Sequence, residues 1–377
     1  MIIGFDGKRA VNNLTGLGNY SRLVLQSLAM ADAGSHRLLV YTPEMRRNPR
    51  LDALKACENV EFRFPGPVGF SGSLWRTFGI SNHLLPDKVE IYHGLSNELP
   101  LNIRKSGVKS VVTLHDVIYR RLPSCYNPAD RFLYDFKYGR SCRNADRVIA
   151  ISECTKRDAM EFYGVAEDRI DVVYQGCDDI FRRPVSRKDL EEIRQRYSLP
   201  ERYLLQVGTI EWRKNLALSA SALAGLDKDV YLVAVGRDRK GYKKEVIEAA
   251  RRSGVAADRI IWLEGLPFQD LPGVYRNASV AVLPSRYEGF GIPVIEAMEC
   301  EVPFIGAKGS CLEEAGGPAG RYVDPDSVDE MIEELRIILN GGSEITKRVE
   351  EGKLYVRRFD NSSMAKNLLD VYAHTLQ

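Results

Sequence analysis

The chain has 377 residues, of which 28% are charged, and its formal net charge is only +2. This length allows two domains with separate cores, and the near-neutral charge argues against a general nucleic-acid-binding protein. The seven cysteines are scattered without a C-x-x-C pair, so they indicate neither a disulfide framework nor a zinc site and favour a reducing, cytoplasmic setting. The N-terminus predicts a strand rather than a signal peptide, and no apolar run approaches the ~20 residues that span a bilayer.

Short apolar runs alternate with helical segments along the first half of the chain. This alternation predicts a doubly wound α/β domain built on a parallel sheet that is covered on both faces. The expected strands are 2–5, 38–41, 60–64, 91–93, 111–114 and 148–151.

Two glycines, Gly16 and Gly18, follow the first expected strand and precede an amphipathic helix expected over 21–30. Glycines at a helix start let the backbone approach a phosphate, which is the favoured interpretation, and the alternative is a tight turn without a ligand. A dinucleotide-binding turn requires a third glycine, but Ser21 occupies that position and no acidic ribose contact follows. The sequence therefore argues against NAD.

His115 and Asp116 end another expected strand, which places them at the carboxyl edge of the sheet. Open α/β sheets bind their ligands at this edge. A single histidine at a strand end is often structural, but the chain has only five histidines. His115 is therefore a candidate for a ligand contact, with Asp116 as a residue that would orient the loop.

The segment 119–147 carries seven Lys or Arg residues against three Asp, with aromatic residues between them. A basic, aromatic helix is typical of a surface that meets lipid headgroups or a pyrophosphate-linked acceptor. The alternative is a solvated helix whose aromatic side chains pack into the core, and the pattern slightly favours it.

A second sheet is expected after the charged linker 180–200, with strands at 203–208, 230–235, 260–263, 280–283 and 304–306. Gly208 and Thr209 follow its first strand, and Arg213 and Lys214 stand before an apolar helix that starts at Leu216. The helix dipole disfavours cations at a helix start unless they serve a ligand. A diphosphate is such a ligand, because it needs cations where backbone donors converge.

The segment 286–299 follows the expected strand at 280–283 and predicts a glycine turn and then a helix. Gly289 and Gly291 loosen the turn, and Pro293 suits the first turn of a helix. Two carboxylates bracket the turn with E-x7-E spacing, Glu288 and Glu296.

The string EGFGIPVIEAM at 288–298 resembles the E-x7-E signature of retaining GT-B glycosyltransferases of family 4. The strings T-x-H-D at 113–116 and G-T-I-E-x-R-K-N at 208–215 resemble its mannosyltransferase branch. Many members carry Gly-Arg where this chain has Gly208-Thr209, which leaves open how the phosphate charge is divided. The resemblance covers nearly the whole chain.

The resemblance implies a GT-B fold, in which two Rossmann-like doubly wound parallel-sheet domains face a central cleft. Residues 1–180 would form the acceptor-binding domain, joined by a returning C-terminal helix at 360–377. Residues 181–359 would form the nucleotide-sugar-binding domain. It also implies that no metal or cofactor is needed, because Arg, Lys and helix N-termini stabilise the leaving diphosphate. The D-x-D string at 324–326 is accordingly expected to be a structural turn.

The resemblance also implies roles for individual residues. Glu288 and His115 would contact the transferred sugar, Glu296 would hold the ribose, and Arg213 and Lys214 would stabilise the diphosphate. The remaining expected donor contacts are Gly16, Gly18, Gly208, Thr209, Phe290, Gly291 and Ile292.

The expected activity is retaining transfer of a hexose to a glycan or lipid-linked acceptor in surface-polysaccharide assembly. GDP-mannose is the first expectation for the donor and a UDP-hexose the second. The expected location is the cytoplasm, with possible peripheral contact at the inner membrane surface. A sugar-nucleotide epimerase of the same fold is an alternative, although such enzymes should lack EGFGIPVIE. A two-lobed binding module without catalysis is another, and it would bind ligand without releasing nucleotide.

Overall fold

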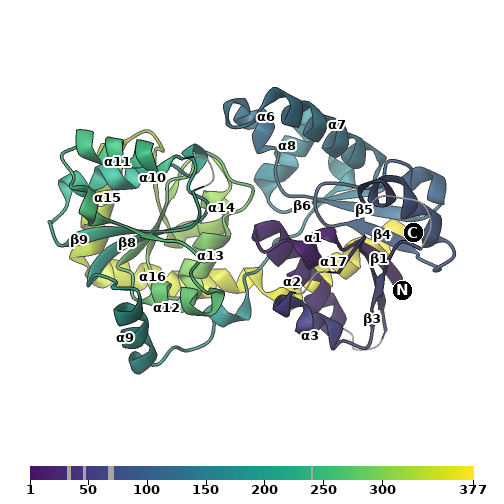
Figure 1. Ribbon diagram of the computed structural model, residues 1–377, viewed down its shortest axis with the longest axis horizontal. Helices are drawn as coiled ribbons and strands as arrows, with labels where there is room; N and C mark the ends of the chain where they lie inside the picture. Colours follow the sequence, from purple (N-terminus) through teal and green to yellow (C-terminus); the bar gives the residue numbers. More distant parts are fainter. Residues whose placement is uncertain (32–34, 46–47, 67–71, 239–240) are drawn as a thin grey trace. The chain divides into compact units, whose positions relative to one another are not determined.

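The chain divides into two compact units in the computed structural model, which describes residues 1–31, 35–45, 48–66, 72–238 and 241–377. Unit 1 contains residues 1–176 and 359–377, and unit 2 contains residues 177–358 (Figure 1). The division falls at 176/177, close to the expected boundary at 180, and the C-terminal helix belongs to unit 1.

Unit 1 is built on a parallel sheet, which has seven strands among the described residues, in the order β3-β2-β1-β4-β5-β6-β7. Its strands are β1 (Ile2–Asp6), β2 (Arg37–Tyr41), β3 (Val60–Arg63), β4 (Ile91–Gly94), β5 (Lys109–Leu114), β6 (Arg147–Ala150) and β7 (Ile170–Val172). Its helices are α1 (Lys8–Asn12), α2 (Gly16–Met30), α3 (Asp52–Lys55), α4 (Gly72–Leu74), α5 (Ser81–Leu84), α6 (Ile118–Arg121), α7 (Pro128–Asn144), α8 (Glu153–Tyr163) and α17 (Asn361–Leu376).

Unit 2 is built on a second parallel sheet, with six strands in the described chain, in the order β10-β9-β8-β11-β12-β13. Its strands are β8 (Arg202–Val207), β9 (Val230–Val235), β10 (Ile260–Leu263), β11 (Val280–Leu283), β12 (Phe304–Ala307) and β13 (Arg321–Val323). Its helices are α9 (Arg187–Arg196), α10 (Leu216–Ala222), α11 (Lys243–Arg252), α12 (Leu271–Arg276), α13 (Ile292–Glu299), α14 (Leu312–Gly316), α15 (Val328–Asn340) and α16 (Ser343–Tyr355).

The doubly wound α/β architecture predicted for both halves is confirmed. In unit 2, α10, α11 and α15 cover one face of the sheet, while α12, α13 and α16 lie on the other (Figure 1). The central strands are apolar along their length because both of their faces are buried, as in β11, where every residue is buried. In each unit the strand order reverses next to the first strand, and this switch point is where open α/β sheets bind ligands.

The start of α2 differs from the prediction, because the helix begins at Gly16 instead of position 21. Thr15 is the extended N-cap residue, so both glycines lie in the first helical turn. A Cβ atom on Gly18 would lie 1.9 Å from the Asn13 carbonyl oxygen. Gly18 therefore permits the preceding loop to pack directly against the helix.

Helix α17 is anchored in unit 1 through a buried polar chain. The Tyr372 hydroxyl lies 2.6 Å from His93 Nδ1, and His93 Nε2 lies 2.8 Å from the Thr113 hydroxyl. Burial lowers the pKa of His93 to about 3, so the ring stays neutral and pairs one donor with one acceptor. These bonds join the last helix to β4 and β5, which lie far from it in sequence.

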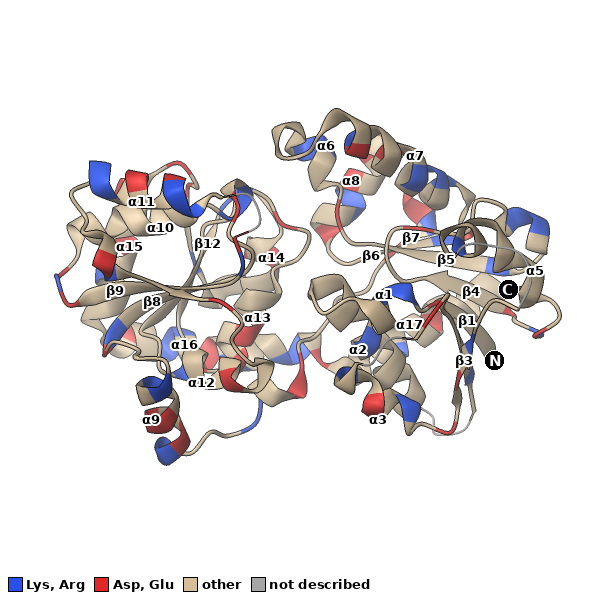
Figure 2. Cartoon of the chain, in the orientation of Figure 1, with Lys and Arg blue, Asp and Glu red and all other residues tan. Residues whose placement is uncertain are grey.

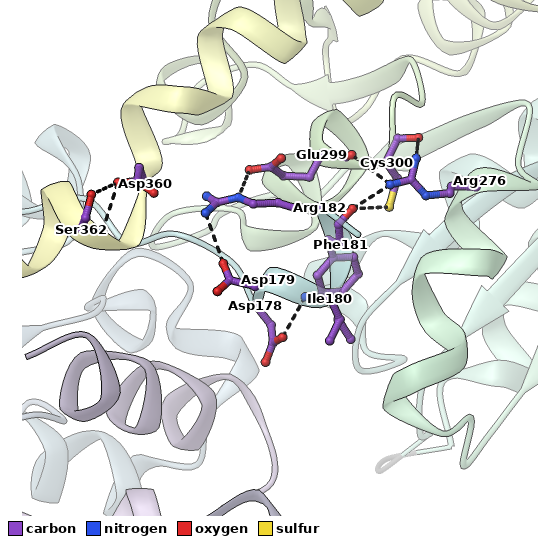
Figure 3. Close-up of polar contacts among 10 residues, drawn as sticks. All are labelled: Asp178, Asp179, Ile180, Phe181, Arg182, Arg276, Glu299, Cys300, Asp360 and Ser362. Carbon is purple, nitrogen blue, oxygen red and sulfur yellow. Dashed lines mark hydrogen bonds and ion pairs between the residues drawn. The ribbon is translucent and has the colours of Figure 1, made fainter. Parts of the chain in front are cut away.

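The two segments that join the units are fixed by local polar contacts (Figure 3). In unit 2, Arg182 donates to Glu299 at 2.8 Å, and Arg276 donates to the Phe181 carbonyl at 2.8 Å. In unit 1, the Asp360 side chain caps α17 by accepting from the Ser362 backbone N–H. The chain therefore joins the packing of unit 2 within a few residues of leaving unit 1.

Candidate functional site

Three charged side chains from two loops meet at the switch point of unit 2. Lys214 Nζ lies 2.5 Å from Glu288 Oε1, and Arg213 Nη1 lies 3.0 Å from Glu288 Oε2. The cations follow β8 and the carboxylate follows β11, so neighbouring strands bring together residues 74 positions apart. We call Arg213, Lys214 and Glu288 the charged trio.

The charged trio is largely shielded from solvent. The Glu288 residue is 8% exposed, and the Arg213 and Lys214 side chains are 13% and 16% exposed. Burial alone would raise the pKa of Glu288, but Arg213 and Lys214 outweigh it and lower the pKa to about 2. The carboxylate is therefore ionised at neutral pH, and the trio carries one net positive charge.

The two cations are held differently. Arg213 also donates to the Tyr287 carbonyl at 2.8 Å and to Glu211 Oε1 at 2.7 Å, so its guanidinium is tied to both loops. Lys214 uses one of its three N–H donors for Glu288, its sole side-chain hydrogen bond within the described residues. Lys214 thus keeps donors for a further anion, whereas Arg213 orders the site.

The backbone of the cationic turn is clamped by side chains that the sequence reasoning missed. Gln206 on β8 is buried, donates to the Lys214 carbonyl at 2.7 Å and accepts from Ser219 on α10 at 2.8 Å. Asn215 has a left-handed backbone with φ 56° and donates to the Pro325 carbonyl at 2.7 Å. The one sequence feature that could have indicated this clamp is Gln206, a polar amide within an otherwise apolar strand.

Gly208 and Thr209 line a small pocket together with Lys214. The Gly208 N–H donates to the Val235 carbonyl at 2.9 Å, and a Cβ atom on Gly236 would lie 1.8 Å from the Gly208 carbonyl oxygen. A Cβ atom on Gly208 itself would lie 3.5 Å from Lys214 Cε, so the lysine side chain runs along the turn.

The turn after Glu288 is shaped by Gly291, which has φ 113° and precedes α13. A Cβ atom there would also lie 2.6 Å from Leu312 Cδ2, so two independent constraints select glycine. Phe290 is buried, and Ile292 begins α13 two residues later. Beneath the turn, the Cys311 Sγ lies 2.9 Å from the Phe290 carbonyl oxygen, a support not anticipated from the sequence.

Glu296 lies inside α13 and is 8% exposed. The Tyr275 hydroxyl donates to its Oε2 at 2.8 Å. Burial is the main cause that raises the pKa of Glu296 to about 7, and the nearby Asp178 carboxylate raises it further. This carboxyl group therefore changes charge near neutral pH, unlike Glu288.

The other predicted site residues, Gly16, Gly18 and His115, lie in unit 1. A Cβ atom on Gly16 would meet no atom within 4 Å, so that position is open to a ligand, whereas Gly18 meets the Asn13 backbone. His115 is 5% exposed, its Nε2 donates to the Leu95 carbonyl at 2.8 Å, and the Tyr20 ring contacts it edge-on. Burial lowers the pKa of His115 to about 4, so its ring is neutral with Nδ1 as an acceptor.

The basic, aromatic segment 119–147 divides between core and surface. Tyr126, Tyr134 and Tyr138 pack against the core of unit 1, while Phe132 and Phe136 on α7 are 77% and 48% exposed. Several of its cations are paired with acids of unit 1: Arg120 with Asp135, Arg121 with Asp158 and Glu161, Lys137 with Glu98 and Arg147 with Asp171. Both signs of charge accordingly occur along α6, α7 and α8 (Figure 2).

The D-x-D string at 324–326 forms the structural turn that was predicted. The Asp324 side chain accepts from the Asp326 backbone N–H at 2.8 Å, and Asp326 pairs with Arg286. In the described ranges, no group of three or more His, Cys, Asp or Glu residues is placed to hold a metal ion. No helix of those ranges combines the length and apolar character needed to cross a bilayer.

Comparisons with known proteins match both units. The family model described as Glycosyltransferase Family 4 matches residues 15–180, and the model described as Glycosyl transferases group 1 matches residues 189–355. The chain is 31% identical over 243 residues to O-antigen chain mannosyltransferase B of Escherichia coli, covering 63% of this chain and 62% of that protein. It is 26% identical over 268 residues to the E. coli serotype-specific mannosyltransferase WbdA, covering 68% of this chain and about a third of that one (33%).

Solved structures share the fold over almost the whole chain. HepE of Anabaena, crystallised with UDP and glucose, matches with a TM-score of 0.77 at 19% identity, covering 99% of this chain and 100% of that chain. WaaG, a glycosyltransferase involved in lipopolysaccharide biosynthesis, matches with a TM-score of 0.71 at 18% identity, covering 98% and 99%. These neighbours show the GT-B fold, and the two family models, which together match most of the chain, show that it belongs to the family 4 glycosyltransferases.

Proposed function

We propose that the protein is a retaining mannosyltransferase that transfers mannose from GDP-mannose to a glycan or lipid-linked acceptor during surface-polysaccharide assembly. The mannosyltransferase relatives support the sugar and the polysaccharide context, although the chain spans only 62% and 33% of the two E. coli proteins compared above. A UDP-hexose donor is the second candidate, as the sequence analysis left open.

The observation that carries this proposal is the charged trio at the switch point of unit 2. A leaving diphosphate develops negative charge in the transition state, and preorganised cations in a shielded site stabilise that charge strongly. Lys214 is shielded, holds its Nζ beside Glu288 and retains N–H donors. In our proposal Lys214 therefore carries most of the diphosphate charge, and Arg213 keeps Glu288 ionised and oriented.

The remaining residues take roles that their surroundings permit. The ionised Glu288 carboxylate would accept hydrogen bonds from the sugar hydroxyls, next to the backbone of Phe290, Gly291 and Ile292. Glu296, held by Tyr275, would accept from the ribose hydroxyls when it is ionised. The turn of Gly208 and Thr209 would border the phosphates. The N-terminus of α13 would receive them, because backbone N–H groups at a helix start favour anions.

His115, Gly16 and Gly18 complete the proposed machinery from unit 1. A neutral His115 suits a sugar contact, because its Nδ1 can accept a hydrogen bond from a hydroxyl without adding charge. We assign no covalent nucleophile and no metal, since cations and helix N–H groups supply the electrostatic stabilisation.

Peripheral membrane contact is also proposed, through the exposed face of α7. Phe132, Leu133 and Phe136 are exposed there, and an apolar stripe beside cations suits the boundary of an anionic bilayer. Flotation with anionic and neutral liposomes tests this part. Equal binding of the protein to anionic and neutral liposomes, or no binding to either, would contradict the proposed membrane contact.

A thermal-shift panel of GDP, UDP, ADP, GDP-mannose and UDP-glucose, each with EDTA, tests the donor. A ligand that binds only the native state raises the melting temperature. Selective stabilisation by GDP and GDP-mannose in EDTA is expected. Stabilisation by UDP compounds alone would move the donor to a UDP-sugar and revive the epimerase, and no response at all would contradict the enzyme assignment.

A further inference from the structure

Trp212 stands apart from the other tryptophans of the chain. It opens the short turn Trp212–Lys214 that carries the two cations of the charged trio. It is 42% exposed, whereas Trp75 is buried and Trp262 is partly buried. Among the described residues of unit 2, the exposed large apolar side chains are Trp212, Ile247 and Leu354, so Trp212 is the single aromatic one.

One face of the Trp212 ring is covered and held. The Arg286 guanidinium lies over the indole with its Cζ 4.6 Å from the ring centroid, and Asp326 pairs with Arg286. The Arg286 backbone N–H also donates to the Arg213 carbonyl at 2.9 Å, which joins the two loops at the residue after Trp212. The exposed part of the indole is therefore its other face and its rim. Because Arg286 already orders the ring, binding of a ligand there would cost little conformational entropy.

The chemistry of this surface suits a sugar ring. A pyranose presents an apolar C–H face with hydroxyl groups at its edge, which matches an indole that combines an apolar face with one N–H donor. The Trp212 N–H has no hydrogen-bond partner in the part of the chain that the structure describes. This exposed indole belongs to the same turn as the shielded cations Arg213 and Lys214.

The position of Trp212 separates it from the expected nucleoside. Trp212, Arg286 and Asp326 follow β8, β11 and β13, and Asn215 of the same turn is tied to Pro325 before α15. Glu296 lies on α13, which covers the opposite face of the sheet from α10 and α15 (Figure 1). A ribose at Glu296 would therefore leave Trp212 on the far side of the charged trio.

We propose that Trp212 is a stacking platform for a sugar ring of the acceptor glycan. This inference rests on the proposed glycosyltransferase function and names the class of acceptor that the site recognises: a carbohydrate chain. The platform places the acceptor sugar next to Arg213 and Lys214, where the diphosphate leaves.

The first experiment follows the three tryptophan indole N–H signals by NMR in the full chain saturated with GDP, with Trp212→Phe identifying the signal of Trp212. The probe is mannotriose. It should shift the Trp212 signal and leave the signals of Trp75 and Trp262 in place. A Trp212 signal that mannotriose leaves at its position in the GDP-saturated chain would overturn the proposal.

The second experiment measures transfer from GDP-mannose to mannotriose. Trp212→Ala should raise the mannotriose concentration at half-maximal rate by about tenfold, while Trp212→Phe, which keeps an aromatic face, should raise it less. The stabilisation of Trp212→Ala by GDP-mannose should equal that of the unmodified chain. Ile247→Ala is the matched control, because it removes another exposed apolar side chain of unit 2 and should change neither value.

The two hypotheses fail in different ways. A chain that is not stabilised by any nucleotide contradicts the proposed function. A chain that is stabilised by GDP-mannose, but whose half-maximal mannotriose concentration is the same in Trp212→Ala and Ile247→Ala, contradicts the platform alone.

Discussion

Lys214 and Arg213 are adjacent in sequence but differ in how the structure engages them. Arg213 is tied to Glu211, Glu288 and the Tyr287 carbonyl, while Lys214 contacts Glu288 and keeps donors for a ligand. Gly208-Thr209 supplies no cation where many family members have Gly-Arg, and in the proposed function Lys214 takes up that phosphate charge.

Lys214→Ala should lower turnover by about a hundredfold or more, as expected when a donor that stabilises transition-state charge is removed. The measurement is the steady-state rate of mannose transfer with saturating donor. Lys308→Ala, which removes an exposed lysine of unit 2 paired with Glu330, is the control and should retain full turnover. Near-normal turnover in Lys214→Ala would remove the phosphate role.

Glu296 predicts a pH dependence of donor binding. Its folded-state pKa is raised to about 7, so the protonated form dominates below that pH and cannot accept both ribose hydrogen bonds. If only the ionised form is competent, its population falls about tenfold between pH 8 and pH 6, and donor affinity should fall equally. Calorimetric titration with GDP-mannose suits this test, because its diphosphate has no group that titrates in this range.

Glu296→Gln is the matched variant, since it keeps the shape but has no titrating group. It should bind GDP-mannose more weakly than the unmodified chain at pH 8 and with nearly the same affinity at pH 6 and pH 8. Protein stability should change with pH in the opposite direction to donor affinity. The raised pKa of Glu296 stabilises the ligand-free fold at low pH, and this contribution to the free energy of unfolding is lost as pH rises through 7. Donor affinity that does not depend on pH in the unmodified chain would count against the ribose assignment.

At the scale of elements, the loop after β8 and the helix α17 illustrate two kinds of anchoring. The cationic turn is held by Gln206 and Asn215 through hydrogen bonds to backbone carbonyls, which fix its shape without using the charged groups. Helix α17 is held by apolar burial and by Tyr372, whose hydroxyl satisfies the buried His93 ring.

Tyr372→Phe should destabilise the protein by about 1–3 kcal/mol, because it leaves a buried imidazole nitrogen without a partner. Urea unfolding followed by far-ultraviolet circular dichroism measures this change. Tyr231→Phe is the control: its hydroxyl makes no hydrogen bond within the described residues, so the substitution should stay within about 0.5 kcal/mol. Equal stability of the two variants would show that the His93 contact contributes little.

At the scale of the whole molecule, the C-terminal segment 359–377 completes unit 1, whose other residues are 1–176. The face of α17 that packs on unit 1 buries Met364, Ala365, Leu368, Val371 and Tyr372. Unit 2 has its own apolar core and contains the charged trio. Its stability therefore should not depend on α17, which belongs to unit 1.

Deleting residues 361–377 should therefore weaken unit 1 selectively, because it exposes the apolar surface that α17 covers. Hydrogen exchange followed by mass spectrometry should show faster exchange in β1, β4 and β5 and unchanged protection in β8, β9 and β11. Deletion of Gln377 alone, which lies beyond the end of α17, is the control. Full protection of the unit 1 strands in the longer deletion would contradict the assignment of α17 to their stability.

The sequence alone determined the local elements and the chemical groups available to them. Buried parallel strands appear as apolar runs, so the predicted strands of both sheets lie within two residues of the observed ones, as when β5 begins at Lys109 instead of 111. Glycine, proline and charged residues at strand ends indicated both loops of the candidate site. Unusual backbone angles favour glycine, and a cation at a helix start is unfavourable unless an anion balances it.

Only the tertiary structure decided which of these groups meet. The pairing of Lys214 with Glu288, the clamp by Gln206, the support by Cys311 and the contact of Arg286 with Trp212 all join segments that become neighbours through sheet order or helix packing. Local periodicity indicates whether a residue is buried but not which residues it contacts. The sequence therefore showed neither that Gly18 packs against the Asn13 backbone inside α2 nor that Arg286 lies over Trp212. The exposure, the pKa and the contacts of a side chain are properties of the packed molecule. The different contacts of Arg213 and Lys214 therefore follow from the tertiary structure.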